Sequence, residues 1–153
     1  MAVAPIPAGY HSVTPYLIVK DAVKALDFYK RAFGATELLR LDNPDGTIAH
    51  GEFRIGDSPV MFAEAMDTYR DPKAIGGSPV SFMIYVPDVD RVFAQAIAAG
   101  ATEQRPVADQ FYGDRTGTLV DPFGHVWSIA THKEDLSQAE IDERFRKLGG
   151  GGG

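Results

Sequence analysis

The sequence of 153 residues contains no cysteine, which excludes disulfide bonds, thiolate metal sites and cysteine nucleophiles. No apolar run approaches the roughly 20 residues that a membrane-spanning helix needs. Positive charge is also scarce, since 15 Lys and Arg stand against 21 Asp and Glu and give a net charge of −6. A nucleic-acid backbone would be repelled by this charge. The sequence therefore predicts neither nucleic acid nor membrane as a partner.

The N-terminal stretch MAVAPIPAGYH lacks the basic segment and apolar stretch of a signal peptide. Together with the absence of cysteine, this predicts a cytoplasmic location. The length corresponds to about one domain. Apolar residues make up 44% of the chain, which is ordinary for a globular protein with a real core.

The tetrapeptide Gly-Ala-Thr-Glu occurs twice, starting at Gly34 and at Gly100. Each copy follows a strand-like apolar run, an aspartate that can cap a helix, and a segment with apolar residues at helical spacing. Each glycine is suited to end that helix. A shift of 66 residues places 16–37 on 82–103 without a gap. We therefore interpret the chain as two βαβββ modules.

The predicted fold is α+β, with two βαβββ modules forming a cupped mixed β-sheet and helices on its outer face. Module one covers about residues 12–66 and module two about 80–132 of a single domain, 1–136. The capping-box pattern SQAE predicts a C-terminal helix over 137–148. Residues 149–153 form a flexible glycine tail by composition.

A sheet with one helix per module is covered on one face only, so its other face must be buried by something else. Side by side, the two modules are expected to make one larger curved sheet with a concave inner face. Alternation along the strands places apolar residues on the helix side, namely Leu17, Val19, Phe53, Ile55, Phe82, Ile84 and Val86. The predicted inner face mixes polar and aromatic residues, as a ligand cleft does; it includes Tyr16, His50, Phe62, Glu64 and Tyr85.

Four stretches carry a resemblance to a known family: VTPYLIVKDAVKALDFYKRAFGATELL, GTIAHGEFRIGDSPVMFAEA, FMIYVPDVDRVFAQAIAAGA and YGDRTGTLVDPFGHVWSIATH. Over about residues 12–132 the sequence resembles the vicinal oxygen chelate superfamily, which includes glyoxalase I, bleomycin resistance proteins and extradiol dioxygenases. It looks most like the bacterial branch of phosphonate-operon-associated proteins. The resemblance implies paired βαβββ modules and a homodimer. An apolar stripe on the C-terminal helix, formed by Ile141, Phe145 and Leu148, also favours a homodimer.

In metal-dependent members of that superfamily, the first and fourth strands of each module supply His, Glu or Gln ligands. Carried over residue by residue, these positions fall on Thr14, on Val60 or Phe62, on Ser81 and on Ser128. None of these side chains offers the imidazole nitrogen or carboxylate oxygen that a divalent cation binds. The resemblance therefore predicts that this protein belongs to a branch without the usual metal ligands. It also predicts that the protein binds neither a metal nor a cofactor.

His50 lies in the middle of the strand-like segment IAHGEF, on the predicted inner face with Glu52 and Glu64. It is either a hydrogen-bonding or acid–base residue of the cleft or a buried structural histidine. Glu64 orients His50, binds a cationic ligand group, or lies solvated at the strand end. A relocated metal site built from these three residues is a further alternative.

The segment from Phe111 to Arg115 combines two aromatic residues with an acid and a base, and it is expected at the lip of the cleft. Phe111 and Tyr112 are predicted to stack on a planar ligand. Arg115 either binds a ligand carboxylate or phosphate or pairs with Asp114 and ties the loop together.

Four other residues are singled out by type alone. Trp127 is interpreted as core packing and His125 as a turn or surface residue. His11 and His132 receive no role.

The sequence thus predicts a metal-independent small-molecule-binding protein of the glyoxalase/bleomycin-resistance type, with an aromatic or amphipathic ligand in the sheet cup. The predicted ligand contacts are Tyr16, His50, Phe62, Glu64, Tyr85, Phe111, Tyr112 and Arg115. Whether the protein catalyses a reaction stays open. The alternative is a lyase, isomerase or dioxygenase of the same superfamily, with a relocated metal or with His50, assisted by Glu64, as a general base.

Overall fold

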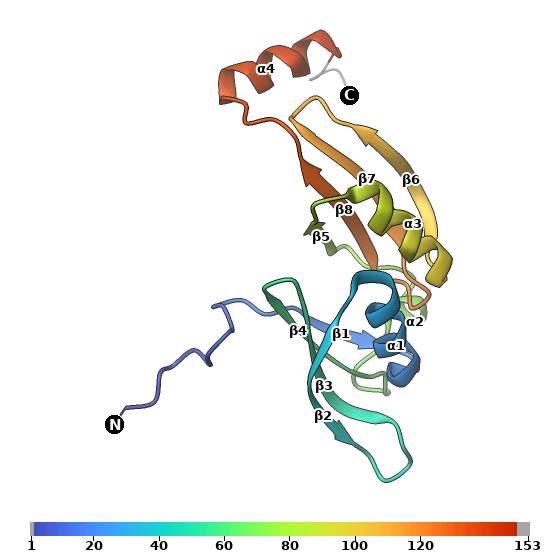
Figure 1. The fold of residues 1–153 in the computed structure, drawn as a ribbon. Helices are drawn as coiled ribbons and strands as arrows, with labels where there is room; N and C mark the ends of the chain where they lie inside the picture. The colour runs from blue at the N-terminus through green and yellow to red at the C-terminus, as the bar shows by residue number, and fades with distance from the viewer. Residues whose placement is uncertain (1, 150–153) are drawn as a thin grey trace.

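The computed structural model describes residues 2–149, which form two βαβββ modules followed by a helix (Figure 1). Module one contains β1 (Tyr16–Val19), α1 (Ala22–Phe33), β2 (Thr36–Asp42), β3 (Ile48–Ile55) and β4 (Ser58–Glu64). Module two contains β5 (Ser81–Tyr85), α3 (Val89–Ala99), β6 (Thr102–Asp109), β7 (Asp114–Val120) and β8 (Val126–His132). The connection between the modules carries the short α2 (Pro72–Ile75), and α4 (Gln138–Lys147) follows β8. The predicted α+β fold with a duplicated module is confirmed.

Hydrogen bonds divide the strands into two four-stranded sheets, ordered β1-β4-β3-β2 and β5-β8-β7-β6. In each sheet the first pair is parallel and the other pairs are antiparallel. The larger curved surface expected from the sequence therefore consists of two separately hydrogen-bonded units. The modules meet through their helix sides, because α1 and α3 pack against each other near the middle of the molecule (Figure 1).

The two predicted helices of the repeat begin and end where the sequence indicated. The side chains of Asp21 and Asp88 accept hydrogen bonds from the first turns of α1 and α3, and Gly34 and Gly100 follow the helix ends with positive φ. Since α1 has 12 residues and α3 has 11, the caps lie 67 residues apart and the glycines 66. The gap-free overlay is therefore one residue out over the first strands. The short α2 was not predicted, and β7 begins at Asp114, inside the segment that was expected at the lip of the cleft.

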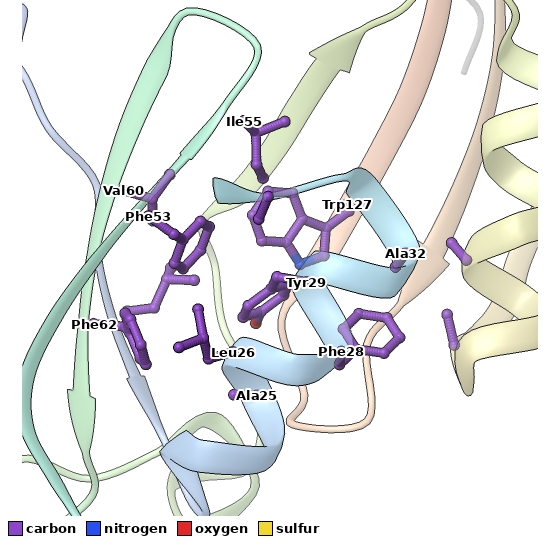
Figure 2. Packing of buried hydrophobic residues seen from close by; sticks show 14 of the residues in the cluster. Ala25, Leu26, Phe28, Tyr29, Ala32, Phe53, Ile55, Val60, Phe62 and Trp127 are labelled. Carbon is purple, nitrogen blue, oxygen red and sulfur yellow. The ribbon is translucent and has the colours of Figure 1, made fainter. Parts of the chain in front are cut away.

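The hydrophobic core is centred on α1 (Figure 2). The ring of Tyr29 lies 5.1 Å from that of Phe53 on β3 and 5.5 Å from that of Trp127 on β8, measured between ring centroids. Tyr29 and Phe53 are fully buried, and Trp127 is buried almost as completely. The prediction that Trp127 packs in the core is confirmed, and its partner comes from the other module.

The turn before β8, with the sequence DPFGH, holds the modules together through a buried carboxylate. Asp121 is only 3% exposed. Its Oδ1 accepts hydrogen bonds from the backbone N–H groups of Phe123 and His125, and its Oδ2 accepts from the Tyr29 hydroxyl at 2.5 Å and the Trp127 indole at 2.9 Å. Burial raises the pKa of Tyr29 well above its usual value, and the adjacent Asp121 carboxylate raises it further.

His125 is a second link between the modules. Its ring is buried, and Nε2 lies 2.9 Å from the carbonyl oxygen of Ile18 on β1. The prediction of a turn residue is therefore correct in position, but the ring is not at the surface.

No helix within residues 2–149 is both long enough and apolar enough to span a membrane.

Candidate functional site

The strand register decides which side chains lie on the inner face, the sheet face opposite the helices. Tyr16 on β1 pairs with Met61 on β4, and Met61 pairs with Glu52 on β3, so these three lie on one face. Phe62 and Glu64 alternate with Met61 and therefore lie on the helix side. Their predicted placement on the inner face was wrong.

The physical reason is the β3–β4 turn. Ile55 pairs with Ser58 across only two intervening residues. A two-residue hairpin reverses the odd–even parity of the faces, so odd positions point to the helices on β3 and even positions do so on β4. Strand β4 was assigned the opposite parity at the sequence level.

Phe62 is a core residue, 1% exposed, with its ring centroid 5.4 Å from that of Phe53. Figure 2 shows it beside Leu26 of α1. Opposite it on β3 stands Gly51, where an added Cβ would lie 2.5 Å from the Phe62 ring. Glycine at position 51 thus provides the room in which the ring packs.

Glu64 closes the start of α1. Its two carboxylate oxygens accept hydrogen bonds from the backbone N–H groups of Asp21 and Ala22, at 2.7 and 2.9 Å. The carboxylate consequently does not meet His50, and the suggested His50–Glu52–Glu64 metal site does not assemble. Within residues 2–149, no group of three or more His, Cys, Asp or Glu side chains is placed to hold a metal ion.

The resemblance implies four metal-ligand positions, and the register shows which residues lie on the inner face at two of them. On β4 the inner-face residue is Met61 rather than Val60 or Phe62. On β8 it is Ser128, as predicted, whose hydroxyl lies 2.9 Å from that of Thr118. Neither thioether nor hydroxyl is a usual ligand for a divalent cation.

A chain of hydrogen-bonded side chains, Tyr16–His50–Glu52–Tyr10, crosses the inner face of module one. The Tyr16 hydroxyl lies 2.7 Å from His50 Nδ1, and His50 Nε2 lies 2.8 Å from Glu52 Oε2. The Tyr10 hydroxyl donates to the other Glu52 oxygen. Because a carboxylate only accepts, Nε2 carries a hydrogen, which leaves Nδ1 as the ring atom that faces the Tyr16 hydroxyl. His50 is thus both held by protein partners and connected to the surface through Tyr16.

The charges of this chain are set by its hydrogen bonds. Burial tends to raise the pKa of Glu52, but hydrogen bonds from Tyr10 and His50 outweigh it and lower the pKa below the usual value. Burial raises the pKa of Tyr16, with Tyr69 and Glu52 adding to the effect. Near neutral pH, Glu52 is therefore ionised and Tyr16 keeps its proton.

Tyr16 also lines a cavity of about 830 Å³, which we call the module-one cavity. This volume lies within the range of small-molecule sites. All of its lining comes from module one and the segment that follows it: Tyr16, Ile18, Asn43, Asp45, Thr47, Ile48, Ala49, Ala63, Glu64, Ala65, Met66 and Tyr69. The segment around Met66 and Tyr69, which follows β4, thus forms part of the wall.

Module two has a cluster of its own, which the sequence did not suggest. Asp114 is buried and accepts from the Tyr85 hydroxyl at 2.8 Å and from His132 Nδ1 at 2.7 Å. His132 Nε2 lies 2.7 Å from an oxygen of Asp135. Because both ring nitrogens face carboxylates, the arrangement favours the doubly protonated, charged ring. Only the pairing of Asp114 with His132 across β7 and β8 brings the cluster together.

This cluster predicts a pH dependence of stability. Hydrogen bonds to Asp114 and then to Asp135 raise the pKa of His132. A group whose pKa is raised on folding contributes its full stabilisation below its unfolded pKa of about 6.5 and loses it as the pH rises through the folded value. We therefore expect the melting temperature to fall above about pH 6.5 in part through this group, and His132→Gln to flatten that slope. An NMR titration of the His132 ring measures the pKa directly; a value at or below about 6.5 would contradict the assignment.

The predicted aromatic pair at the cleft lip packs against α4 instead of standing free. The Phe111 ring stacks on Phe145 with centroids 5.4 Å apart, and Tyr112 meets Phe111 edge-on at 5.2 Å. The Arg144 guanidinium also donates to the carbonyl oxygen of Phe111. Figure 1 shows this loop and α4 at the far end of module two from β1. Within one chain, Phe111 and Tyr112 do not line the module-one cavity.

Arg115 points to the helix side of module two. It forms a two-pronged pair with Asp90 of α3 at 2.8 and 2.9 Å and a third contact with Asp109 at 3.2 Å. The expected pairing with Asp114 was wrong, because neighbouring residues of a strand point to opposite faces. The arginine ties β7 to α3 and lies away from the inner face.

The model of the glyoxalase/bleomycin resistance protein/dioxygenase superfamily matches residues 9–129. The chain belongs to this superfamily. A protein of Mycobacterium tuberculosis strain H37Rv is similar to it at 38% identity over 145 residues, covering 92% of this chain and 85% of that protein.

Two solved structures share the fold. TioX from Micromonospora sp. ML1 is 30% identical with a TM-score of 0.63, covering 83% of this chain and 100% of that one. The fosfomycin resistance protein FosX from Listeria monocytogenes is 19% identical with a TM-score of 0.62, covering 86% and 97%. At that identity the second likeness concerns the fold alone.

Proposed function

We propose that this protein is a metal-independent small-molecule-binding protein of the superfamily, which takes an aromatic or amphipathic ligand on its inner face. The observation that carries the proposal is the module-one cavity, with its volume of about 830 Å³. Its wall combines apolar side chains with two phenols, Tyr16 and Tyr69, and a few polar groups. This mixture is typical of sites that bury a ring system and orient it through a small number of hydrogen bonds.

The residues at the four ligand positions support metal independence. Thr14, Met61, Ser81 and Ser128 provide no imidazole or carboxylate, which fits the branch without the usual ligands. Elemental analysis of the purified protein tests this, with no stoichiometric metal expected. Stoichiometric metal that disappears in His50→Ala would instead favour a metal site in the alternative location.

A homodimer is part of the proposal, because both inner faces are left uncovered in one chain. Tyr16 is 49% and Tyr85 59% exposed, and Leu39, Leu41 and Met83 also expose much of their surface. A sheet buries its apolar face against another layer, and a second copy can supply that layer. In this arrangement Tyr85, Phe111 and Tyr112 would reach a ligand only from the partner copy. Light scattering that returned a monomer mass would refute the dimer.

Ligand binding itself is tested by a thermal-shift screen against planar aromatic compounds, since a ligand of the native state raises its melting temperature. Tyr69→Ala is the site variant, because that ring is 61% exposed and its loss leaves the core intact. Val23→Ala, on the exposed side of α1, is the matched control. We expect hits that shift the wild type and the control alike and the site variant by less. Equal shifts in all three proteins would contradict binding in this cavity.

A second candidate function is proton transfer, favoured by the Tyr16–His50–Glu52 chain. An ionised Glu52 behind His50 orients the ring and supports it as a base that acts through Tyr16, the outermost hydroxyl. For compounds that bind, exchange of an activated C–H proton with solvent D2O, followed by NMR, tests this activity. His50→Gln is expected to abolish exchange while leaving the thermal shift in place.

A further inference from the structure

We infer that the module-one cavity selects cationic aromatic ligands over neutral and anionic ones. The inference rests on the proposed function, because it names the ligand class for the same cavity. Three features carry it: the charge of the lining, the fixed positions of its two carboxylates, and the aromatic side chains of the wall.

The lining carries negative charge only. Among its twelve residues, Asp45 and Glu64 are acidic and none is basic. The basic side chains Lys20 and Arg70 line a neighbouring hollow, which shares Glu64, Ala65 and Met66 with this cavity. An anionic ligand would therefore enter a cavity with no counter-charge in its wall, which costs free energy.

Asp45 is held at the rim by its own turn. Its Oδ1 accepts hydrogen bonds from the Thr47 backbone N–H at 3.0 Å and the Thr47 hydroxyl at 2.6 Å. The Asn43 amide donates to the same hydroxyl at 2.9 Å, so the turn is braced from both sides. Hydrogen bonds from Thr47 lower the pKa of Asp45, which keeps it ionised. Its other oxygen, Oδ2, accepts no hydrogen bond from residues 2–149.

Glu64 adds a second fixed charge. Its carboxylate accepts hydrogen bonds from the two backbone N–H groups at the start of α1, at 2.7 and 2.9 Å, and these fix its position. The positive end of the α1 dipole offsets part of this charge, so Asp45 is the main negative group of the lining and Glu64 adds to it.

The wall also contains the side chains that bind cationic rings. Backbone hydrogen bonds join Met66 and Tyr69 in both directions, at 2.7 and 3.0 Å, and both residues line the cavity together with Tyr16. The phenol rings of Tyr16 and Tyr69 attract a cation through their π faces. The Met66 thioether makes favourable contacts with aromatic rings. A flat ring system that bears a positive charge satisfies both kinds of contact.

Three probes with one ring system test the inference: 9-aminoacridine as the cation, acridine as the neutral compound and acridine-9-carboxylate as the anion. Affinities are measured by calorimetry at pH 7.5 at low and at physiological ionic strength. We expect the cation to bind on the order of 10-fold more tightly than the anion, a difference of about 1.4 kcal/mol, with acridine between them. The preference should weaken as salt screens the carboxylates.

Asp45→Asn is expected to weaken binding of the cation by about 2- to 5-fold, as for an exposed charge pair, and to leave acridine unchanged. Asp57→Asn, in the exposed β3–β4 turn, is the matched control and should change neither. Equal affinities for the three probes, or tighter binding of the anion, would overturn the inference and leave the proposed function standing. If no probe and no screened aromatic compound bound at all, the proposed function would fail first.

Discussion

Asp121→Ala is expected to lower the free energy of unfolding by about 3–5 kcal/mol, because several buried hydrogen-bond donors lose their acceptor at once. The Tyr29 hydroxyl and the Trp127 indole N–H both end at its Oδ2, inside the core. Two backbone N–H groups of the turn lose Oδ1 as well. Each buried donor left without a partner costs about 1–3 kcal/mol. Urea unfolding followed by tryptophan fluorescence measures the loss.

Two further variants separate the hydrogen bonds from the general effect of a substitution. Asp57→Ala removes an exposed carboxylate and should change stability by less than about 0.5 kcal/mol. Tyr29→Phe removes one of the four donors, so combined with Asp121→Ala it should cost clearly less than the sum of the two single changes. A cost for Asp121→Ala close to that of Asp57→Ala would show that this carboxylate does not hold the modules together.

Phe62→Ala is expected to cost about 3–5 kcal/mol, since it empties a site filled by a fully buried ring. The neighbouring change Met61→Ala should cost about 1 kcal/mol, because that side chain lies half-buried on the opposite face. Comparing the two variants shows which face of β4 packs into the hydrophobic core. Denaturant unfolding of both variants gives the comparison.

The same pair distinguishes packing from ligand contact. If Phe62 contacted ligand on the inner face, Phe62→Ala would change affinity and leave the stability of the free protein nearly intact. We expect the reverse. A small loss of stability in Phe62→Ala with a large loss in Met61→Ala would mean that the register of β4 is misassigned.

Local sequence signals predicted the elements of the fold well. The capping aspartates, the glycines after the helices and the repeated tetrapeptide located α1 and α3 to the residue, because those signals act within one turn of chain. The overlay failed over the first strands since α1 carries one extra residue. A comparison without gaps misses the extra residue in α1, because both helices have clear signals at their two ends.

The site was predicted less completely, because it depends on parity and on pairing between distant strands. Tyr16 and His50 were placed on the same face, and the structure brings them within hydrogen-bond distance. Phe62 and Glu64 were predicted on the wrong face, because the two-residue β3–β4 turn reverses the odd–even parity of the faces. His132 had no visible role, since its partner Asp114 lies 18 residues away and meets it only across a strand pair. The β3–β4 turn was visible in the sequence, and counting parity through it would have corrected β4.

The position of Tyr29 between Phe53 and Trp127 has a consequence for how the molecule loses its structure. Side chains of each module pack into the core of the other, so neither module has a complete hydrophobic core by itself. Although the chain contains a duplication, the halves are not independent cooperative units, and melting should proceed in one transition. If the polypeptide were cut in the connection near α2, each of the two fragments would expose apolar surface on the helix side of its sheet. The two fragments are expected to fold when they are mixed, because each supplies the apolar side chains that complete the core of the other.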